Sequence, residues 1–161
     1  CSASRAGLAD PAAMEKAVES MTTLNKKASQ IMKRYRVHGC TDVTGFGLAV
    51  HLNEMLDNKY SALLYSDKIP FFDAAYKYAG EFLITAAGQR NRSFMEGKIS
   101  FRRKDFALEE IVFDPQTSGG LLISAEPVSA EKCAAKMIEN GIDAHIIGEI
   151  TERRDIDIKV I

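Results

Sequence analysis

The chain has 161 residues, 46% of them hydrophobic, which is enough to bury one ordinary core and excludes a disordered or fibrous protein. Its 21 basic and 22 acidic side chains leave a formal net charge of -1, which argues against a dedicated nucleic-acid or membrane-surface protein. An uninterrupted apolar run of about 18 residues, which a membrane-spanning helix needs, is absent from the sequence.

Hydrophobic periodicity predicts the elements of the first half. Residues 11–35 have helical spacing behind Asp10–Pro11, a typical helix start, and form one helix or two joined near Thr22–Thr23. Hydrophobic periodicity fades over residues 83–104. Between Arg90 and Lys104 there are six basic residues and one acidic residue, so we expect a basic loop there. The other predicted elements are helices at residues 48–57 and 71–79 and a strand at residues 60–65.

The second half mixes helices with strands. Residues 107–113 are predicted to make one or two helical turns that end at Asp114–Pro115, because the residue before proline avoids the helical region. We also expect a strand at residues 121–124, a helix at 130–138 that ends before Gly141, and strands at 144–150 and 156–160. This order predicts an α+β sandwich, a mixed sheet packed with helices.

The cysteines indicate the setting of the protein. The chain has an odd number of cysteines, and they are widely spaced, at Cys1, Cys40 and Cys133. Neither a disulfide framework nor a structural zinc site is therefore expected. We therefore predict a reducing, cytoplasmic location. Cys133 lies on the apolar stripe of its helix and should be part of the core. Because the chain begins at Cys1 rather than Met, we expect residues 1–161 to be a single domain of a longer protein.

The segment Asp42-Val43-Thr44-Gly45-Phe46-Gly47 is the first candidate site. Glycines let backbone N–H groups approach a ligand, and the N-terminus of the helix that follows attracts anions. Because a bare carboxylate repels phosphate, Asp42 beside such a site indicates a bridging Mg²⁺ ion. The structural alternative is that Thr44 caps the helix and the glycines only form a turn, since short glycine motifs often match by chance.

The segment Thr117-Ser118-Gly119-Gly120 is the second candidate site. Its hydroxyls and glycines follow a proline-bounded turn and are able to cradle phosphate oxygens. It lacks the Gly-Lys-Ser/Thr ending of a Walker A loop. The alternative is an ordinary loop that leads into a strand.

Other polar residues are ambiguous. His51 lies on a polar helix face and is expected to be solvated, and Cys40 is expected to be a buried, inert thiol. Arg90 and Arg92 either hold a polyphosphate or are simply solvated. The basic residues between Lys26 and Arg36 are most simply explained as a solvated face near a helix C-terminus.

Both candidate segments resemble signatures of the selenophosphate synthetase (selenide, water dikinase) family. The resemblance covers the C-terminal half of that family, which belongs to a superfamily with aminoimidazole ribonucleotide synthetase. One departure is Ala86-Ala87-Gly88, where the family often has a Gly-Gly pair. The matching stretches are Gly7–Asp10, Ser20–Asn25, His38–Gly47, Arg90–Arg92 and Asp114–Leu122.

The resemblance implies a ferredoxin-like-related C-terminal domain of an ATP-dependent kinase. That enzyme makes selenophosphate from selenide, ATP and water, and releases AMP and phosphate. By resemblance, Asp42 helps to hold Mg²⁺ at the nucleotide phosphates. The wall of the phosphate site is then formed by Thr44, Gly45, Gly47, Thr117, Ser118, Gly119 and Gly120. The family's catalytic cysteine or selenocysteine lies in the N-terminal domain, so no catalytic residue is expected here, and Cys1 is not that residue.

The resemblance also implies partners. These are the N-terminal domain of the same enzyme, ATP and selenide, and a second copy in a homodimer of the full-length chain; this domain alone should be inactive. Two alternatives stay open. The chain is either a domain of another ATP-dependent member of the superfamily, or a module whose basic stretches, 26–36 and 90–104, dock tRNA or an acidic protein, although no recognition motif for nucleic acid is evident.

Overall fold

The computed structural model describes residues 2–161, so the prediction about Cys1 lies outside the described residues. The described helices are α1 (Ser2–Arg5), α2 (Pro11–Thr22), α3 (Lys26–Met32), α4 (Gly47–Leu56), α5 (Asp73–Gly80), α6 (Ala86–Phe94), α7 (Phe106–Phe113) and α8 (Pro127–Glu139). The described strands are β1 (Val37–Asp42), β2 (Tyr60–Leu64), β3 (Ile99–Phe101), β4 (Leu121–Ala125), β5 (Gly148–Glu152) and β6 (Ile158–Val160).

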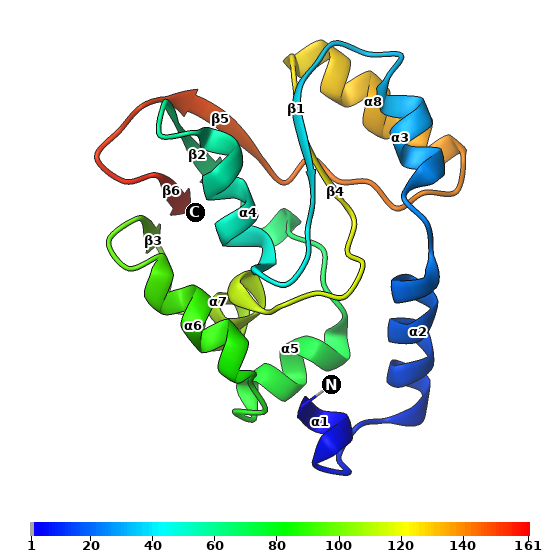
Figure 1. Ribbon diagram of the computed structural model, residues 1–161, viewed down its shortest axis with the longest axis vertical. Coiled ribbons are helices and arrows are strands. Elements are labelled where there is room, and N and C mark those ends of the chain that lie inside the picture. Colours follow the sequence, from blue (N-terminus) through cyan, green and yellow to red (C-terminus); the bar gives the residue numbers. More distant parts are fainter. Residues whose placement is uncertain (1) are drawn as a thin grey trace.

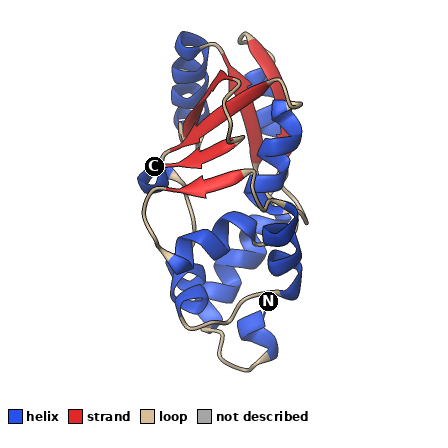
Figure 2. Cartoon of the chain, turned by 90° about the vertical axis from the view of Figure 1, so that its left-hand side faces the viewer, coloured by secondary structure: helices blue, strands red, loops and turns tan. Residues whose placement is uncertain are grey.

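The strands form two sheets. One has four strands in the order β3-β6-β2-β5, in which β2 pairs antiparallel with β5 and β6 runs parallel to both β2 and β3. The other is an antiparallel ribbon of β1 and β4. Helices α5, α6 and α7 lie together below the strands in both views (Figures 1 and 2). Helix α2 runs along one side of the molecule and joins α1 to α3 (Figure 1). The mixed sheet with its helices confirms the predicted α+β class.

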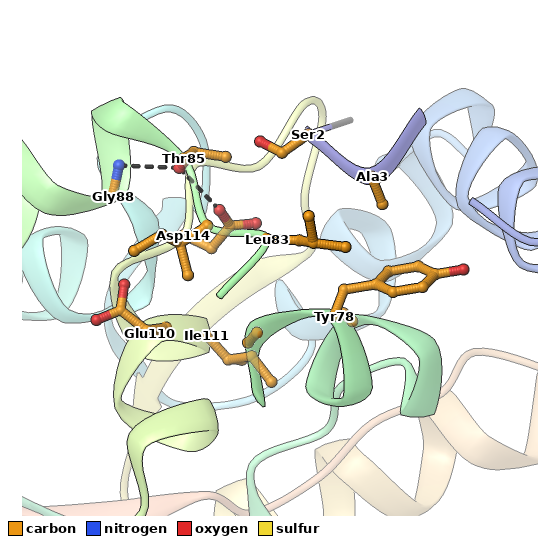
Figure 3. A pocket seen from close by; sticks show the side chains of 12 residues that line it. Ser2, Ala3, Tyr78, Leu83, Thr85, Gly88, Glu110, Ile111 and Asp114 are labelled. Carbon is orange, nitrogen blue, oxygen red and sulfur yellow. Dashed lines mark hydrogen bonds between the residues drawn. The ribbon is translucent and has the colours of Figure 1, made fainter. Parts of the chain in front are cut away.

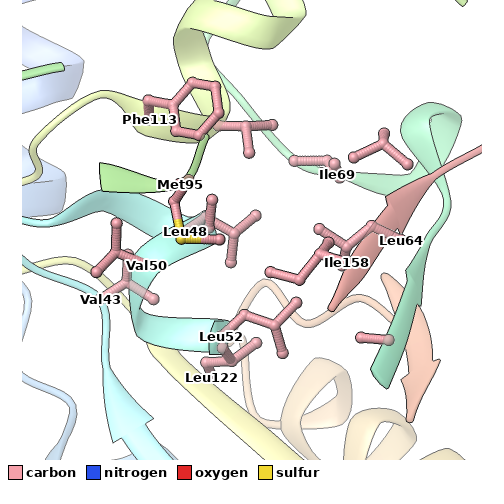
Figure 4. Close-up of a cluster of buried hydrophobic side chains, with 14 of the residues drawn as sticks. Val43, Leu48, Val50, Leu52, Leu64, Ile69, Met95, Phe113, Leu122 and Ile158 are labelled. Carbon is pink, nitrogen blue, oxygen red and sulfur yellow. The ribbon is translucent and has the colours of Figure 1, made fainter. Parts of the chain in front are cut away.

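Helix α4 is the centre of the main core. It contacts β1 and β2 as well as α6 and α7. Leu48, Leu52 and Leu56 recur every four residues and are buried, and each such side chain contributes about 2 kcal/mol by leaving water. Figure 4 shows Val43 and Leu122 on one side of α4 and Leu64 and Ile158 of the four-stranded sheet on the other.

A second core cluster covers the β1–β4 ribbon. Ala28 and Ile31 of α3 pack with Cys133 and Met137 of α8, against partly buried side chains that include Leu121 of β4. Cys133 is 4% exposed, which confirms its prediction as a core residue. The ribbon is therefore held by packing on α3 and α8 as well as by its contact with α4.

The prediction of a basic loop at residues 83–104 is wrong. The segment contains α6 and β3. Helix α6 begins because the Thr85 hydroxyl accepts from the Gly88 N–H at 3.0 Å, a typical N-cap. Its buried side contains only small or polar residues, Gly88 and Asn91, so hydrophobic periodicity could not reveal it.

Several boundaries refine the other predictions. Residues 11–35 form two helices, because the chain leaves the helical region at Thr23. The strand predicted at 144–150 begins only at Gly148, where pairing with Leu64 starts. Strand β1 was not predicted, since Val37–Asp42 includes glycine and alternates only between half-buried and exposed positions. Asn140 ends α8 and Gly141 has φ +75°, as its predicted helix-ending role requires.

Candidate functional site

The two candidate segments lie side by side at one end of the β1–β4 ribbon. Asp42, the last residue of β1, pairs with Leu121, the first residue of β4. Beyond this pair, the Val43 N–H donates to the Gly120 carbonyl at 3.0 Å, and the Gln116 N–H donates to the Thr44 carbonyl at 3.0 Å. Residues 42–47 and 116–120 therefore form one surface, as the sequence hypothesis of a shared phosphate site requires.

Two of the four glycines in these segments are there because backbone packs on backbone. Gly47 has φ +73°, and a Cβ there would lie 2.8 Å from the Phe113 carbonyl oxygen. A Cβ on Gly119 would collide with the Val43 carbonyl oxygen. Gly45 and Gly120 instead have open space where a Cβ would be. Gly119 therefore lets the two segments pack on each other, and Gly47 lets the start of α4 pack on the backbone of Phe113 and Asp114. Gly45 and Gly120 leave backbone accessible.

Asparagines from two other matching stretches bind these segments. Asn25 donates its side-chain amide to the Gly119 carbonyl at 2.8 Å. Asn91, which is 7% exposed, donates to the carbonyls of Gly45 at 3.2 Å and Phe113 at 2.9 Å. The chain thus gathers four separated stretches at one place. Sequence reasoning found these stretches by resemblance but did not assign this bridging role to the asparagines.

Arg92 neither reaches the candidate site as a free cation nor is simply solvated. Its guanidinium pairs with Glu109 at 3.0 Å and with Glu110 at 2.8 Å, and lies over the Phe113 ring at 4.9 Å from the centroid. Arg90 is exposed. The stretch from Arg90 to Lys104 is therefore not one uniform basic surface.

His51 is buried, which corrects the prediction of a solvated histidine. It is 7% exposed, and its Nε2 lies 3.1 Å from the Thr44 hydroxyl oxygen. The structural alternative for Thr44 is also wrong, because the N-cap of α4 is Phe46 and makes no side-chain capping bond. Thr44 instead contacts the imidazole of His51, seven residues further along the chain.

Cys40 is exposed, not buried as predicted. Partial burial of the sulfur and the nearby charge of Asp42 raise the pKa of the Cys40 thiol. A raised pKa keeps the thiol protonated at neutral pH, and the protonated form is a poor nucleophile. The inertness of Cys40 stays a prediction, which this shift favours.

The candidate site is open and has few ligands for a metal. Asp42, Gly45, Thr117 and Ser118 are exposed. Within residues 2–161, no three His, Cys, Asp or Glu side chains gather as a metal-binding group. Mg²⁺ requires about six oxygen ligands, several of which are usually waters or phosphates. Asp42 thus fits as one ligand of an ion shared with other groups, but not as a complete site.

Two cavities are lined by other residues of the chain. One, of about 90 Å³, is lined by residues that include Tyr78, Thr85, Glu110 and Asp114 (Figure 3). The other, of about 370 Å³, is lined by aromatic side chains such as Phe71 and by residues near the C-terminal Ile161. Neither of these two cavities is lined by the predicted site residues.

Asp114 makes stability depend on pH. Burial raises the pKa of its carboxyl above the ordinary 3.8, and the nearby Glu110 raises it further. The Thr85 hydroxyl donates a hydrogen bond of 3.0 Å to the Asp114 Oδ1, which lowers the pKa but does not cancel the rise. Since the folded state prefers the protonated acid, stability is lost as pH rises through the folded pKa. We expect Asp114→Asn, which can still accept from Thr85, to raise the melting temperature at pH 7. The gain should vanish below pH 3.8, which thermal melts across pH would measure; an equal gain at all pH values would contradict this account.

Comparison of the sequence with known families places the chain in a class of domain. A family model described as AIR synthase related protein, C-terminal domain, matches residues 1–161. The chain belongs to that family.

Curated relatives of the chain are selenide, water dikinases, which confirms the resemblance seen in the sequence. The selenide, water dikinase of Agathobacter rectalis is 45% identical over 161 residues, which are 99% of this chain and 47% of that protein. That of Desulfitobacterium hafniense strain DCB-2 is 44% identical over 154 residues, which are 96% of this chain and 45% of that protein. The chain thus spans about half the length of the curated relatives it matches.

None of the helices in residues 2–161 has both the length and the apolar character that crossing a membrane requires.

Proposed function

We propose that this chain is the C-terminal domain of a selenide, water dikinase, an enzyme that makes selenophosphate from selenide, ATP and water and releases AMP and phosphate. The observation that carries the proposal is the meeting of Asp42 with residues 116–120 at one end of the β1–β4 ribbon. The relatives support it, because their matches cover 99% and 96% of this chain at 45% and 44% identity.

In this proposal the surface helps to neutralise and orient the negative charge of the ATP phosphates. Phosphoryl transfer depends on donors and cations placed around developing charge more than on covalent chemistry from the protein. Asp42 would be one ligand of a Mg²⁺ ion, which supplies charge neutralisation when bound. The backbone at Gly45 and Gly120 is open enough for phosphate oxygens to approach, and the Thr117 and Ser118 hydroxyls are exposed beside it. These residues would bind and orient the phosphates.

The proposal requires partners that complete the site. One carboxylate cannot hold Mg²⁺ firmly, so the N-terminal domain of the same enzyme would supply the other ligands, the catalytic residue and the selenide site. The full-length enzyme is proposed to work as a cytoplasmic homodimer. The charge of the C-terminal domain is nearly balanced, and the ion pairs of Arg92 interrupt the basic stretch at residues 90–104, which argues against tRNA as a partner.

Calorimetric titration with Mg-ATP tests this division of the site. We expect the 161-residue chain alone to bind Mg-ATP no more tightly than millimolar and to hydrolyse none, because within residues 2–161 no cluster of three metal-binding side chains stands at Asp42 or elsewhere. The full-length enzyme should bind it well below millimolar. The matched control is full-length Asp155→Ala, which removes an exposed carboxylate in a distant turn and should bind as the unaltered enzyme does. Sub-millimolar binding by the isolated chain would contradict the proposal.

A further inference from the structure

Three polar side chains lie next to one another in series, from the exposed surface of α4 to the candidate site. The Glu54 Oε2 lies 3.2 Å from the His51 Nδ1, and the His51 Nε2 lies 3.1 Å from the Thr44 Oγ1. Glu54 is largely exposed, whereas the side chain of His51 is 9% exposed. Thr44 stands two residues after Asp42, so this series ends beside the proposed ligand of the metal.

The charge of the Glu54 carboxylate favours one of the two ring nitrogens of His51 as the carrier of the proton. No hydrogen bond joins Glu54 to His51, whose Nδ1 is buried without a hydrogen-bond partner in the described part of the chain. The negative charge of the carboxylate 3.2 Å away nevertheless favours a hydrogen rather than a lone pair on Nδ1. In a neutral imidazole the other nitrogen, Nε2, is then an acceptor. Thr44 must therefore donate its hydroxyl hydrogen to Nε2, and its oxygen lone pairs are directed away from the ring.

Packing alone does not explain this arrangement. The His51 ring lies 5.8 Å from the Phe46 ring, centroid to centroid, and an apolar side chain would serve that contact equally well. Burying an imidazole is costly unless its polar atoms find partners. Nε2 has Thr44 as its partner, but Nδ1 has only the charge of Glu54 beside it and makes no hydrogen bond within residues 2–161, and Thr44 does not use its hydroxyl to cap α4.

We propose that Glu54 and His51 are positioning residues that fix the direction of the Thr44 hydroxyl. With its hydrogen committed to His51, Thr44 presents only lone pairs beside Asp42. It accepts hydrogen bonds there from water, including water bound to a cation, and does not donate to a phosphate oxygen. This inference rests on the proposed function, because it assigns a role to Thr44 within the same site.

The first test reads the tautomer in the full-length enzyme. Histidine-selective ¹⁵N labelling, with assignment by His51→Gln, should show a hydrogen on Nδ1 of His51 and a bare Nε2. Glu54→Gln should shift this tautomer balance, and Thr44→Val should shift the Nε2 resonance. A hydrogen on Nε2 in the unaltered enzyme would overturn the inference, because Thr44 would then be free to donate.

The second test is a double-mutant cycle on Mg-ATP binding. Thr44→Val and His51→Leu should each weaken the calorimetric affinity of the full-length enzyme about tenfold, and together no more than either alone, because His51 acts through Thr44. His51→Gln, whose side-chain oxygen can accept near the place of Nε2, and Thr44→Ser should stay close to wild type. Additive losses, or a His51→Gln enzyme as weak as His51→Leu, would overturn the inference.

His145→Gln is the matched control for these variants. His145 also faces a carboxylate, with its Nε2 2.7 Å from the Asp143 Oδ1, but it lies on the exposed surface outside the candidate site. Its loss should leave the affinity unchanged. If the enzyme makes no selenophosphate at all, the proposed function fails, while the His51 tautomer and the cycle still decide this inference. If it makes selenophosphate and the cycle is additive, only this inference fails.

Discussion

Replacing Asp42 by alanine in the full-length enzyme is expected to lower turnover about a hundredfold or more while the fold survives. A metal ion that neutralises charge in the transition state is worth several kcal/mol, and each 1.36 kcal/mol is a tenfold change in rate. Because Asp42 is exposed at the end of β1, its loss should change the free energy of unfolding by less than about 0.5 kcal/mol. Steady-state kinetics at several Mg²⁺ concentrations and a thermal melt measure both effects.

Asp42→Asn separates charge from shape in this experiment. The amide keeps the size of the side chain but is a much weaker ligand for a hard cation, so it should lose nearly as much turnover as alanine. Asp155→Ala, which removes an equally exposed carboxylate elsewhere, should retain full activity. If Asp42→Ala keeps the kinetics and the Mg²⁺ dependence of the unaltered enzyme, then Asp42 is not a metal ligand.

Gly119→Ala is expected to destabilise the domain by about 3 kcal/mol, an effect of overpacking at a close backbone contact. The added Cβ would overlap the Val43 carbonyl oxygen and lie 2.6 Å from the Gln116 Oε1. Relief requires the loop at 116–120 to move away from residues 42–44, which would also break the bond from Asn25 to the Gly119 carbonyl. Denaturant unfolding measures the loss of stability, and the affinity for Mg-ATP measures the separation of the two segments.

The neighbouring glycine provides a control for this substitution. A Cβ on Gly120 would meet no atom within 4 Å, and its φ does not lie in the left-handed region, so Gly120→Ala should change stability by less than about 1 kcal/mol. Equal stabilities of Gly119→Ala and Gly120→Ala would contradict the packing described for these segments.

Elements with strong local patterns were predictable. The helix at α4 and the strand at β2 follow from apolar spacing, and the end of α8 follows from Gly141. Helix α6 was missed because the residues it buries are Gly88 and Asn91, which carry no hydrophobic signal. Strand β1 was missed because its stability comes from pairing with β4, a contact between residues about 80 positions apart.

The candidate site was predictable in part. The residue types in 42–47 and 117–120 identified both segments, but only the tertiary structure shows that Gln116 and Gly120 bond directly to Thr44 and Val43. The burial of His51 was predicted incorrectly, because a polar helix face looks solvated until another segment covers it. The role of Asn91 was hidden for the same reason, since its two acceptors lie 46 and 22 residues away along the chain.

The most direct test of the account is the position of the metal in the full-length enzyme. Mn²⁺ replaces Mg²⁺ at oxygen sites and scatters anomalously, so crystals grown with Mn²⁺ and a non-hydrolysable ATP analogue locate the ion itself. An anomalous peak is expected about 2.1 Å from a carboxylate oxygen of Asp42, between that oxygen and the nucleotide phosphates. Ions bound only to other carboxylates, with the Asp42 side chain turned to solvent, would contradict this expectation.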